Sequence, residues 1–456
     1  MSHAIFDAHL IRRYDINGPR YTSYPTADRF RDGDWTQEYA TALAAADGRA
    51  LSLYLHVPFC ATICFYCACN KINTANSRRA DAYVQRLIHE MELQSKMIEG
   101  TQTVEQLHFG GGTPTFLSDD QFSRIFDALD THFLLGSGNA RDFSVEIDPR
   151  NVAAERIEHL TGLGINRLSI GVQDFDPDVQ KAVNRVQSIE ETSYVIDAAR
   201  SNGVRSVNID LINGLPRQTP GRFERTLERV LELQPDRLSL YSYAHLPQRF
   251  KTQRQINAAE LPTAETKLAL LELAVEMLAD ADYVYVGMDH FAKQSDSLIT
   301  ARNDGTLHRN FQGYTTHGHC NLLGLGVSSI GKVGRVYVQN AKSLADYYEA
   351  IDSKRLACSR GIVASTEDLV VGEVIQDLMC CDAVDFASFR ERAGCDFQNY
   401  FAYAWPKVLD LQQHGLIQLD EDALRVTGRG RFLLRNICMA FDPWLRAAGE
   451  RFSRAI

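Results

Sequence analysis

The sequence predicts an α/β protein in which repeated strand–helix units form a parallel sheet, closed into a barrel or most of one. From about residue 51 to 290, short β-rich runs alternate with amphipathic helix patterns. From about residue 360 the pattern changes to helices and a hairpin. A length of 456 residues allows two or three domains, or one large α/β domain with additions. From the pattern alone, a doubly wound sheet is the alternative architecture.

The predicted strands and helix faces follow in order along the chain. The strands are Leu51–Val57, Val104–Phe109, Phe143–Ile147, Arg167–Ile170, Ser206–Leu211, Arg237–Tyr241 and Tyr283–Val286. Two helices show an apolar face at helical spacing, formed by Tyr83, Leu87, Ile88 and Met91 and by Leu268, Leu271, Val275 and Leu278. Ser118 and Gln121 predict a capping box, and Pro220 predicts the first turn of a helix.

Composition and pattern divide the chain into four parts: a polar lead-in (1–50), the barrel (51–290), a loop-rich, glycine-containing extension (291–359) and a mostly helical C-terminal domain (360–456). The last part predicts a hairpin from Leu416–Gln418 and Leu424–Thr427, which suggests a winged-helix-like fold. Such folds often bind nucleic acid, but residues 360–456 carry 11 basic and 14 acidic side chains, a net charge of −3. The basic cluster in this part is interpreted as a solvated face and consists of Arg425, Arg429, Arg431 and Arg435.

The charge balance excludes some classes of partner. With 48 basic and 58 acidic residues the net charge is −10, which argues against broad binding to nucleic acid or to an anionic membrane. No apolar run approaches the roughly 18 residues of a membrane helix, and the first residues lack a signal-peptide core. We therefore expect a cytoplasmic protein. A reducing compartment suits its ten cysteines, which there suggest metal binding, redox chemistry or packing rather than disulfides.

Three cysteines directly follow the first predicted strand. Cys60, Cys64 and Cys67 have three and two residues between them, so their sulfurs can converge from one tight loop. Zinc is the alternative ligand, but structural zinc sites usually combine two such loops, and no second one follows. Three thiolates suit a [4Fe–4S] cluster with one iron open to a further ligand. Cys69 alternates with Cys67 and is expected to point away, and the six cysteines from Cys320 to Cys438 show no metal-ligand spacing.

The cysteine motif and the glycine-rich run that follows the next strand resemble the radical S-adenosylmethionine superfamily. That run is His108-Phe-Gly-Gly-Gly-Thr-Pro114, in which glycines let the backbone approach a charged ligand closely. Further motifs spread over nearly the whole chain resemble the family of oxygen-independent coproporphyrinogen III oxidases. They are GPRYTSYPT (18–26), the fourth cysteine Cys69, GVQDF (171–175), NIDLINGLP (208–216), YAHLP (243–247), GMDHFAK (287–293) and HRNFQGYTT (308–316).

The resemblance implies a partial (β/α)6-type radical S-adenosylmethionine barrel with Cys60, Cys64 and Cys67 as cluster ligands. It implies S-adenosylmethionine as second cofactor, bound as two molecules in this family. The implied contacts are Tyr54, Tyr66, Gly111, Gly112, Thr113, Glu146, Gln173, Arg185, Asp210, Ala244 and Ile330. At the position of Tyr66 the family more commonly has Phe, and either aromatic ring can stack on a ligand. Cys69 is implied to be functional without a known role. Asp210 also has a physical argument, because a carboxylate within an apolar strand needs a partner.

The resemblance further implies the reaction. A 5′-deoxyadenosyl radical removes a hydrogen from the β-carbon of a propionate, whose C–H bond has no useful acidity. Loss of one electron and of carbon dioxide then leaves a vinyl group. Two such decarboxylations convert coproporphyrinogen III to protoporphyrinogen IX in haem biosynthesis without oxygen. A haem-binding relative without decarboxylase activity is the alternative, although such relatives lack the lead-in motif and the fourth cysteine. The other rivals are a nucleic-acid-modifying radical enzyme and a zinc-dependent scaffold protein.

A substrate with four carboxylates requires local positive charge. We hypothesise that Arg20 and Arg309 bind propionates, because arginine binds carboxylates in a bidentate manner, although each could equally form a structural salt bridge. The lead-in is expected to cover the substrate site, so deleting residues 1–30 should abolish decarboxylation and spare the cluster. The expected partners are the tetrapyrrole and an electron donor such as flavodoxin or ferredoxin, with no nucleic acid and no membrane, and the expected state is a monomer.

Overall fold

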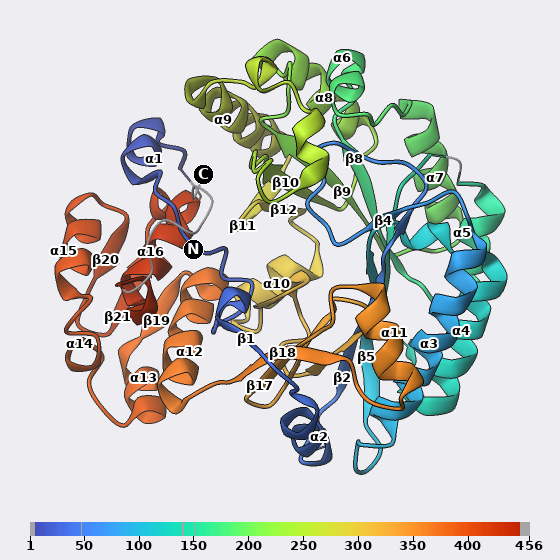
Figure 1. The fold of residues 1–456 in the computed structure, drawn as a ribbon. Helices are drawn as coiled ribbons and strands as arrows, with labels where there is room; N and C mark the ends of the chain where they lie inside the picture. The colour runs from blue at the N-terminus through green and yellow to red at the C-terminus, as the bar shows by residue number, and fades with distance from the viewer. Residues whose placement is uncertain (1–4, 47, 139–140, 151, 447–456) are drawn as a thin grey trace. The chain divides into compact units, whose positions relative to one another are not determined.

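A computed structural model describes residues 5–46, 48–138, 141–150 and 152–446. The chain divides into two compact units (Figure 1). The first, here called the barrel unit, comprises residues 30–263 and 319–363. The second, here called the helical unit, comprises the chain before residue 30, residues 264–318 and the chain from residue 364. The four-part division expected from composition stays a prediction, and each unit is described by itself below.

The barrel unit is built on six parallel strands in the order β2-β5-β7-β8-β9-β10, as a partial (β/α)6 barrel requires. Their bounds are Leu51–Val57, Thr103–Gly111, Asp142–Ile147, Arg167–Gln173, Ser206–Asn213 and Arg237–Ser242. The sequence prediction is confirmed for all six, and it placed β2 at its observed bounds. The others extend one to three residues beyond the predicted runs, because strand ends that carry polar or glycine residues have no periodic signal.

On the other side of β2 the sheet continues with a parallel strand and then with antiparallel ones. β15 (Asn321–Leu325) runs parallel to β2, and the sheet ends in the antiparallel order β16-β17-β18-β1. These strands are Ile330–Val333, Val336–Asn340, Cys358–Val363 and Arg31–Asp32. The stretch 291–359 thus contains more strand than its loop-rich composition predicted. Gly324 lies within β15, and the turn that follows begins only at Gly326.

Helices cover the outer side of the parallel strands, as Figure 1 shows for α3, α4, α5 and α7. The helices of this unit are α2 (Thr36–Ala44), α3 (Arg78–Ser95), α4 (Asp119–His132), α5 (Ala154–Gly162), α6 (Pro177–Ala182), α7 (Ile189–Ser201), α8 (Pro220–Glu232) and α11 (Leu344–Asp352). The predicted capping box of α4 is confirmed, with the backbone N–H of Gln121 donating to the Ser118 hydroxyl at 3.2 Å. Pro220 starts α8 as predicted. On α3, the predicted face is buried at Tyr83, Leu87 and Met91, and Ile88 is only half-buried.

The helical unit combines helices with short antiparallel strands. Its helices are α1 (Ala8–Tyr14), α9 (Ala264–Asp280), α10 (Ser297–Asn303), α12 (Thr366–Cys381), α13 (Phe386–Ala393), α14 (Phe397–Tyr400), α15 (Trp405–Gln413) and α16 (Leu434–Phe441). Its strand pairs are β11 (Tyr283–Gly287) with β12 (His290–Lys293), β13 (His308–Asn310) with β14 (Gly313–Thr315), and β21 (Ala423–Val426) with both β19 (Ala383–Asp385) and β20 (Ile417–Leu419). The predicted C-terminal hairpin is confirmed to within two residues, which supports the winged-helix-like prediction.

Two predictions for this unit are wrong in detail. The strand predicted at Tyr283–Val286 is present as β11, but it pairs antiparallel with β12 after a tight turn and therefore does not extend the run of parallel strands. On α9, Leu270 and Ala274 are buried, whereas Leu271 and Val275 are only half-buried. In a helix as apolar as α9, sequence spacing does not distinguish between neighbouring faces.

The basic cluster of the C-terminal part is also not the solvated face that its sequence predicted. Arg431 and Arg435 are buried, with 3 % and 6 % of their surface exposed. Arg431 donates to the carbonyl of Tyr285, and the Arg435 Nε donates to the carbonyl of Pro19 at 2.7 Å. Only Arg425 and Arg429 are exposed. The two buried guanidinium groups instead satisfy backbone carbonyls, which would be costly to leave unpaired.

The lead-in motif is anchored within the helical unit at one carboxylate. Asp442, just after α16, accepts hydrogen bonds from the hydroxyls of Tyr21 (3.0 Å) and Tyr24 (3.1 Å). Arg29 forms an ion pair with the same carboxylate at 3.1 Å. Asp442 is itself buried, and a buried carboxylate group requires such hydrogen-bond donors. This network explains why the motif combines tyrosines with an arginine nearby.

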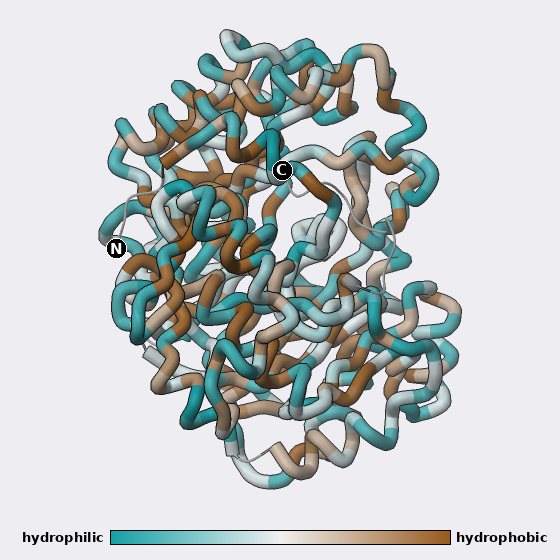
Figure 2. The backbone as a smooth tube through the Cα atoms, turned by 90° about the vertical axis from the view of Figure 1, so that its left-hand side faces the viewer, coloured by the Kyte–Doolittle hydropathy of each residue, from teal (hydrophilic) through white to brown (hydrophobic). Residues whose placement is uncertain are grey.

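The described part of the chain contains no helix that is both long and apolar enough to cross a membrane. Hydropathy changes every few residues along the backbone, which is typical of amphipathic elements packed on one side (Figure 2).

Candidate functional site

The cysteine loop lies directly after β2. It is closed at its base by β3 (Phe59–Cys60), which pairs with β4 (Ile72–Asn73). Between these strands the loop packs on α6, since the Phe65 amide donates to the carbonyl of Val183 at 2.9 Å. Cys60 and Cys64 are buried and Cys67 is half-buried. The predicted ligands are thus held on a loop whose two ends and middle are each fixed to the sheet or to a helix.

The donor set fits an iron–sulfur cluster better than a single zinc ion. The sulfurs of Cys60, Cys64 and Cys67 do not all lie within 4.8 Å of one another. They are therefore more widely spread than the ligands of a single ion. Burial, together with the nearby Cys67 and Cys64, raises the pKa of Cys60 to about 11, although a hydrogen bond from Thr113 opposes the shift. Deprotonating three neighbouring thiols in a largely buried loop requires a multivalent cationic partner.

Cys69 does not point away from the cluster ligands, and this sequence prediction is wrong. Its thiol donates a hydrogen bond to the Cys67 sulfur, which together with the Lys71 charge lowers the pKa of Cys67 to about 5 despite burial. The same hydrogen bond raises the pKa of Cys69 well above its ordinary value. Cys67 and Cys69 lie in a loop and not in a strand, so strand-like alternation does not apply. Cys69 therefore contacts a ligand sulfur as a hydrogen-bond donor.

The glycine-rich turn after β5 lies against the backbone that leads into the cysteine loop. The Gly112 amide donates to the carbonyl of Val57, and the Thr113 amide donates to that of Phe59, each at 2.8 Å. A Cβ atom at Gly112 would lie 2.8 Å from the Phe59 carbonyl oxygen. Gly111 adopts a φ of +115°, which side-chain-bearing residues rarely adopt. Both predicted glycines are required by the geometry, and the Thr113 hydroxyl donates to the Cys60 sulfur at 3.5 Å.

The inner face of the parallel strands is polar, which is unusual for a parallel sheet covered by helices. On β7 and β8 every second residue is buried and apolar, and the residues between them are half-buried. The buried set faces the helices, where each side chain contributes about 1.5–3 kcal/mol to folding. Helix-covered parallel strands usually read as continuous apolar runs, so this alternation indicates a hydrated or ligand-filled interior.

Glu146 lies on this inner face and faces the glycine-rich turn. Its Oε2 accepts from the Gly111 amide, and its Oε1 lies 3.2 Å from His108 Nε2. Burial acts to raise the pKa of Glu146, but the contacts with His108 and Gly111 outweigh it and lower the pKa. With 41 % of its side-chain surface exposed, this charged carboxylate can still accept hydrogen bonds from an ammonium group or a hydroxyl.

Two histidines, neither predicted as a site residue, support the predicted Tyr54. The Tyr54 ring stacks on His108 at 5.8 Å, and its hydroxyl lies 3.1 Å from His56 Nδ1. His56 Nε2 is 2.9 Å from the carbonyl of Asn70, at the end of the cysteine loop. Burial lowers the pKa of His56, so the neutral ring is favoured. The sequence signal that could have found them is their position. His56 lies near the end of the strand that leads into the cysteine loop, and His108 lies near the end of the strand that leads into the glycine-rich turn.

Arg185 brings several predicted residues together near Cys64. Its Nη1 forms an ion pair with Asp148 at 3.1 Å and lies 3.5 Å from the Cys64 sulfur. Its Nη2 donates to the carbonyl of Gly171, next to a bulge where Gln173 adopts a φ of +70°. Arg185 Nε is buried without a hydrogen-bond partner among the described residues. A buried donor without an acceptor favours a ligand at this point.

Asp210, on β9, forms a hydrogen-bonded network across the strands. Its Oδ2 accepts from the Ser169 hydroxyl at 3.0 Å, and its Oδ1 accepts from the Asn208 amide at 2.9 Å. Burial and the negative charge of Glu146 together raise the pKa of Asp210 to about 6, although these hydrogen bonds oppose the shift. The two carboxylates therefore face the same interior and repel each other, which a cationic ligand would relieve.

Ile330 and Ala244 lie at the two ends of this inner face. Ile330 begins β16, and its backbone approaches Gly324, which pairs in register with Tyr54. The buried Glu90 holds the intervening turn by accepting from the Gly326 amide at 2.6 Å. Ala244 follows β10, and its carbonyl accepts from Gln253 at 3.2 Å. All eleven predicted cofactor contacts thus lie in the barrel unit.

Gln253 was not predicted, yet it joins two parts of the site. It lies on the short 3-10 helix η4 (Lys251–Gln255) with only 2 % of its surface exposed. Its amide nitrogen donates to the carbonyl of Tyr66 at 2.9 Å, and its oxygen accepts from the Leu246 amide at 2.6 Å. This side chain therefore fixes the cysteine loop to the segment after β10.

Replacing Gln253 by alanine is expected to make the cluster leave the loop about tenfold faster, because buried backbone groups would lose partners at about 1–3 kcal/mol each. The measurement is the decay of visible cluster absorbance under anaerobic chelator challenge. Gln255→Ala, an exposed residue on the same helix, is the control and should decay like the wild type. Equal decay rates for both variants would contradict the positioning role.

The two predicted substrate arginines lie in the helical unit. Arg20 is exposed, and Arg309, on β13, is 6 % exposed. Neither forms an ion pair among the described residues, so the structural salt bridges considered from sequence are absent there. Both positive charges act on Asp289, where burial raises the pKa and Arg20 and Arg309 oppose the shift.

Comparison with known proteins identifies the class to which this fold and site belong. The radical SAM superfamily profile matches residues 54–230, which include the cysteine loop and the glycine-rich turn, and the profile of the HemN C-terminal domain matches residues 364–433. Sequence similarity then extends over the whole chain. The oxygen-independent coproporphyrinogen III oxidase of Pseudomonas aeruginosa is 50 % identical over 99 % of both chains, and that of Escherichia coli K12 is 44 % identical over 99 % of this chain and 98 % of its own.

A solved structure agrees with this assignment. Coproporphyrinogen III oxidase (HemN) from Escherichia coli, described as a radical SAM enzyme, superposes with a TM-score of 0.93 at 42 % identity, covering 97 % of this chain and all of that one. The chain belongs to the family of oxygen-independent coproporphyrinogen III oxidases. The predicted fold, the [4Fe–4S] cluster and S-adenosylmethionine are confirmed at the level of this family. A second S-adenosylmethionine stays a prediction.

Proposed function

We propose that this chain converts coproporphyrinogen III to protoporphyrinogen IX without oxygen, by oxidative decarboxylation of two propionates to vinyl groups in haem biosynthesis. The observation that carries the proposal is the match to oxidases of this name over nearly the full length of both chains. The site supports it, since three cysteines on one loop face a polar barrel interior instead of a filled core.

In this proposal Cys60, Cys64 and Cys67 hold the cluster, and Cys69 donates a hydrogen bond to the sulfur of Cys67. When bound, the cluster and S-adenosylmethionine supply a carbon radical able to remove a hydrogen atom from a propionate β-carbon. The residues of the chain bind and orient the cofactor and shield the radical. Glu146 accepts from the cofactor's ammonium or hydroxyl groups, the turn at Gly111, Gly112 and Thr113 lets the backbone approach it, and Tyr54 covers one side.

A second S-adenosylmethionine is supported by a separate set of polar groups. Arg185 Nε and the amide nitrogen of Asn213 are buried without hydrogen-bond partners among the described residues. Asp210 lies on the same strand as Asn213 and has a raised pKa, and Gln173 adopts a φ of +70° where β8 ends after a bulge. Together with Tyr66, Ala244 and Ile330, these groups are proposed to hold the second molecule.

The substrate proposal rests on the β13–β14 hairpin of the helical unit. Arg309 Nε and Nη1 and the Gln312 amide nitrogen are buried without hydrogen-bond partners among the described residues. The Arg309 guanidinium lies over the Tyr314 ring at 4.9 Å, which fixes its direction. Unpaired buried donors disfavour the ligand-free state, and a carboxylate would satisfy them. We therefore propose that Arg309 binds a propionate, with Arg20 and Gln312 as further donors.

Arg309→Ala is expected to raise the KM for coproporphyrinogen about tenfold and to leave the cluster absorbance unchanged, because a charge-assisted hydrogen bond is worth about 1.5–3 kcal/mol. Arg309→Lys should recover little, since a lysine cannot bind a carboxylate in a bidentate manner. Arg20→Ala should act in the same direction. Arg425→Ala, which removes an exposed arginine of the same unit, is the control. Unchanged KM values for both Arg20→Ala and Arg309→Ala would exclude the proposed substrate role.

The remaining parts of the proposal concern partners and compartment. An electron donor such as flavodoxin or ferredoxin is proposed, together with a monomeric state. All ten cysteines are free, which suits a reducing compartment and supports a cytoplasmic location.

The activity is tested by anaerobic incubation of the reconstituted protein with coproporphyrinogen III, S-adenosylmethionine and a reductant, with products separated by mass. We expect the successive loss of two molecules of carbon dioxide and the appearance of vinyl groups. An intact cluster with no vinyl-bearing product would overturn the proposal and favour a haem-binding relative.

A further inference from the structure

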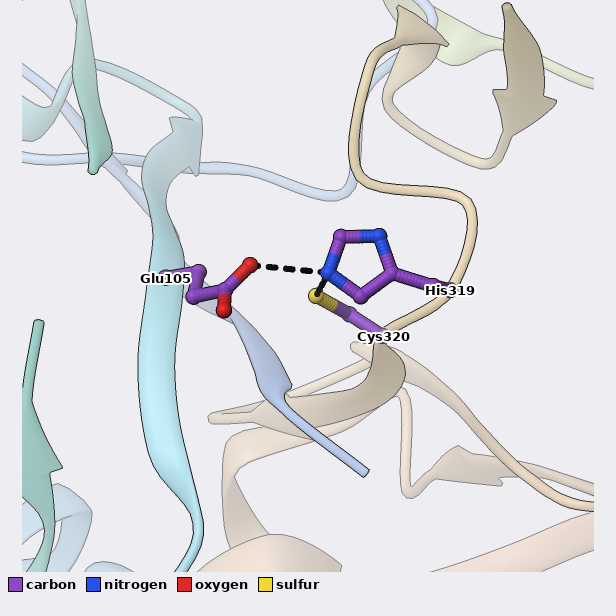
Figure 3. A group of neighbouring side chains, drawn as sticks. All are labelled: Glu105, His319 and Cys320. Atoms are coloured by element: carbon purple, nitrogen blue, oxygen red, sulfur yellow. Dashed lines mark hydrogen bonds and ion pairs between the residues drawn. The ribbon is translucent and has the colours of Figure 1, made fainter. Parts of the chain in front are cut away.

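A second group of metal-ligand side chains lies in the barrel unit, away from the cysteine loop. It consists of Glu105, His319 and Cys320, whose ligand atoms all lie within 4.8 Å of one another (Figure 3). Glu105 is near the start of β5, whereas the glycine-rich turn is at the end of the same strand. Six residues of extended strand separate Glu105 from Gly111, about 20 Å. The proposed cofactor residues therefore do not account for this group.

The local fold brings the three residues together from both sides of β2. In the pairing of β2 with β5, Leu51 is opposite Val104 and Ser52 is opposite Gln106, so Glu105 is the extra residue of a β-bulge. A bulge redirects the side chain it carries. On the other side, His319 and Cys320 immediately precede β15, which also pairs with the start of β2. Sequence spacing could not reveal the group, because its members are 214 residues apart.

The distances from the imidazole to the other two ligand atoms are close to those around a tetrahedral ion. His319 Nε2 lies 2.8 Å from Glu105 Oε2 and 3.6 Å from the Cys320 sulfur. Around tetrahedral zinc, nitrogen and oxygen ligands are about 3.3 Å apart, and nitrogen and sulfur ligands about 3.6 Å apart. The carboxylate and the imidazole would have to separate by about half an ångström. His319 and Glu105 retain 58 % and 31 % of their side-chain exposure, which leaves room for water as a fourth ligand.

We propose that Glu105, His319 and Cys320 form a zinc-binding site that joins β5 to the start of β15 across β2. A thiolate, an imidazole and a carboxylate together are ligands typical of zinc and disfavour magnesium or calcium, which prefer oxygen alone. Burial and the charge of Glu105 raise the pKa of Cys320 to about 12, and a divalent cation acts against both effects. The site would hold together the strands on either side of β2, which carries the cysteine loop at its other end.

The test uses the holoprotein, reconstituted anaerobically so that iron occupies the cysteine loop. Wild type, His319→Gln, Cys320→Ser and the control Cys395→Ser are dialysed against chelator-buffered Zn²⁺. Zinc and iron per chain are measured by elemental mass spectrometry, with melting temperature as a second readout. Cys395 is a half-exposed cysteine outside the group. All three substitutions change side chains that are not fully buried, and unchanged iron content verifies that each variant is folded.

We expect one zinc per chain in wild type and Cys395→Ser, binding at least about tenfold weaker in His319→Gln and Cys320→Ser, and a zinc-dependent rise in melting temperature only in the first two. Equal zinc affinity in all four proteins, no zinc in the wild type, or zinc uptake accompanied by loss of iron would each overturn the proposal.

Discussion

Alanine in place of Gly112 is expected to reduce decarboxylation about 100-fold. The added Cβ would lie 2.8–3.0 Å from the Phe59 and Val57 carbonyl oxygens and the Pro58 carbonyl carbon. These are backbone atoms in the strand that leads into Cys60, so no side-chain rotation can relieve the contact. The turn must move away from the cysteine loop, and displacements of about 1 Å at a reaction centre cost roughly 100-fold in rate.

Three measurements separate the causes of this loss. Iron content reports the cysteine loop, S-adenosylmethionine affinity reports the turn, and product formation reports both. Gly221→Ala, on α8, is the control, because a Cβ there meets nothing within 4 Å. Alanine within a helix should also stabilise that control slightly. If Gly112→Ala kept wild-type activity, the close approach of turn and loop would not be functionally required.

Asp210→Asn is expected to stabilise the protein at pH 8 by up to about 3 kcal/mol and to weaken S-adenosylmethionine binding. The raised pKa of Asp210, about 6 against an ordinary 3.8, means that ionisation disfavours the folded state. The wild type is therefore penalised fully above pH 6, and the penalty declines as the pH falls from 6 to about 3.8, where both states are protonated. Asparagine has no charge to desolvate and can still accept from Asn208.

The measurement is the melting temperature of cluster-loaded protein without S-adenosylmethionine between pH 4 and pH 8. The gain of Asp210→Asn over wild type should grow across this interval. Asp130→Asn removes an exposed carboxylate on α4 and controls for the change in net charge. A destabilised Asp210→Asn at pH 8 would show that the carboxylate is a structural hydrogen-bond acceptor instead of a group held charged for a ligand.

Local sequence patterns predicted the parts of this protein that depend on neighbouring residues. β2 was placed at its observed bounds, and the capping box at Ser118 and the proline at the start of α8 were found where predicted. The cysteine loop and the glycine-rich turn were also evident, because each occupies a few consecutive residues. In each case the physical cause, side-chain alternation, a capping hydrogen bond or a close backbone approach, acts within one segment.

Contacts between distant segments could not be predicted in this way. Gln253 reaches Tyr66 across 187 residues, and nothing in its own surroundings marks it. Arg435 has the spacing of a solvated helix face, yet it is buried because the carbonyl of Pro19, 416 residues away, accepts its hydrogen bond. The predicted direction of the Cys69 side chain was wrong for a different reason, since the side-chain alternation of a strand was assumed for residues in a loop.

Because buried and half-buried residues alternate on β7 and β8, successive residues of one strand have separate roles. Val145 and Ile170 face the helices and hold the layers together, while Glu146 and Ser169 face the interior and contribute little to that adhesion. Mutations on the interior side can therefore change which molecule is bound at small cost to folding, and mutations on the outer side do the reverse. A barrel of this design can acquire new ligands one residue at a time while its scaffold remains the same.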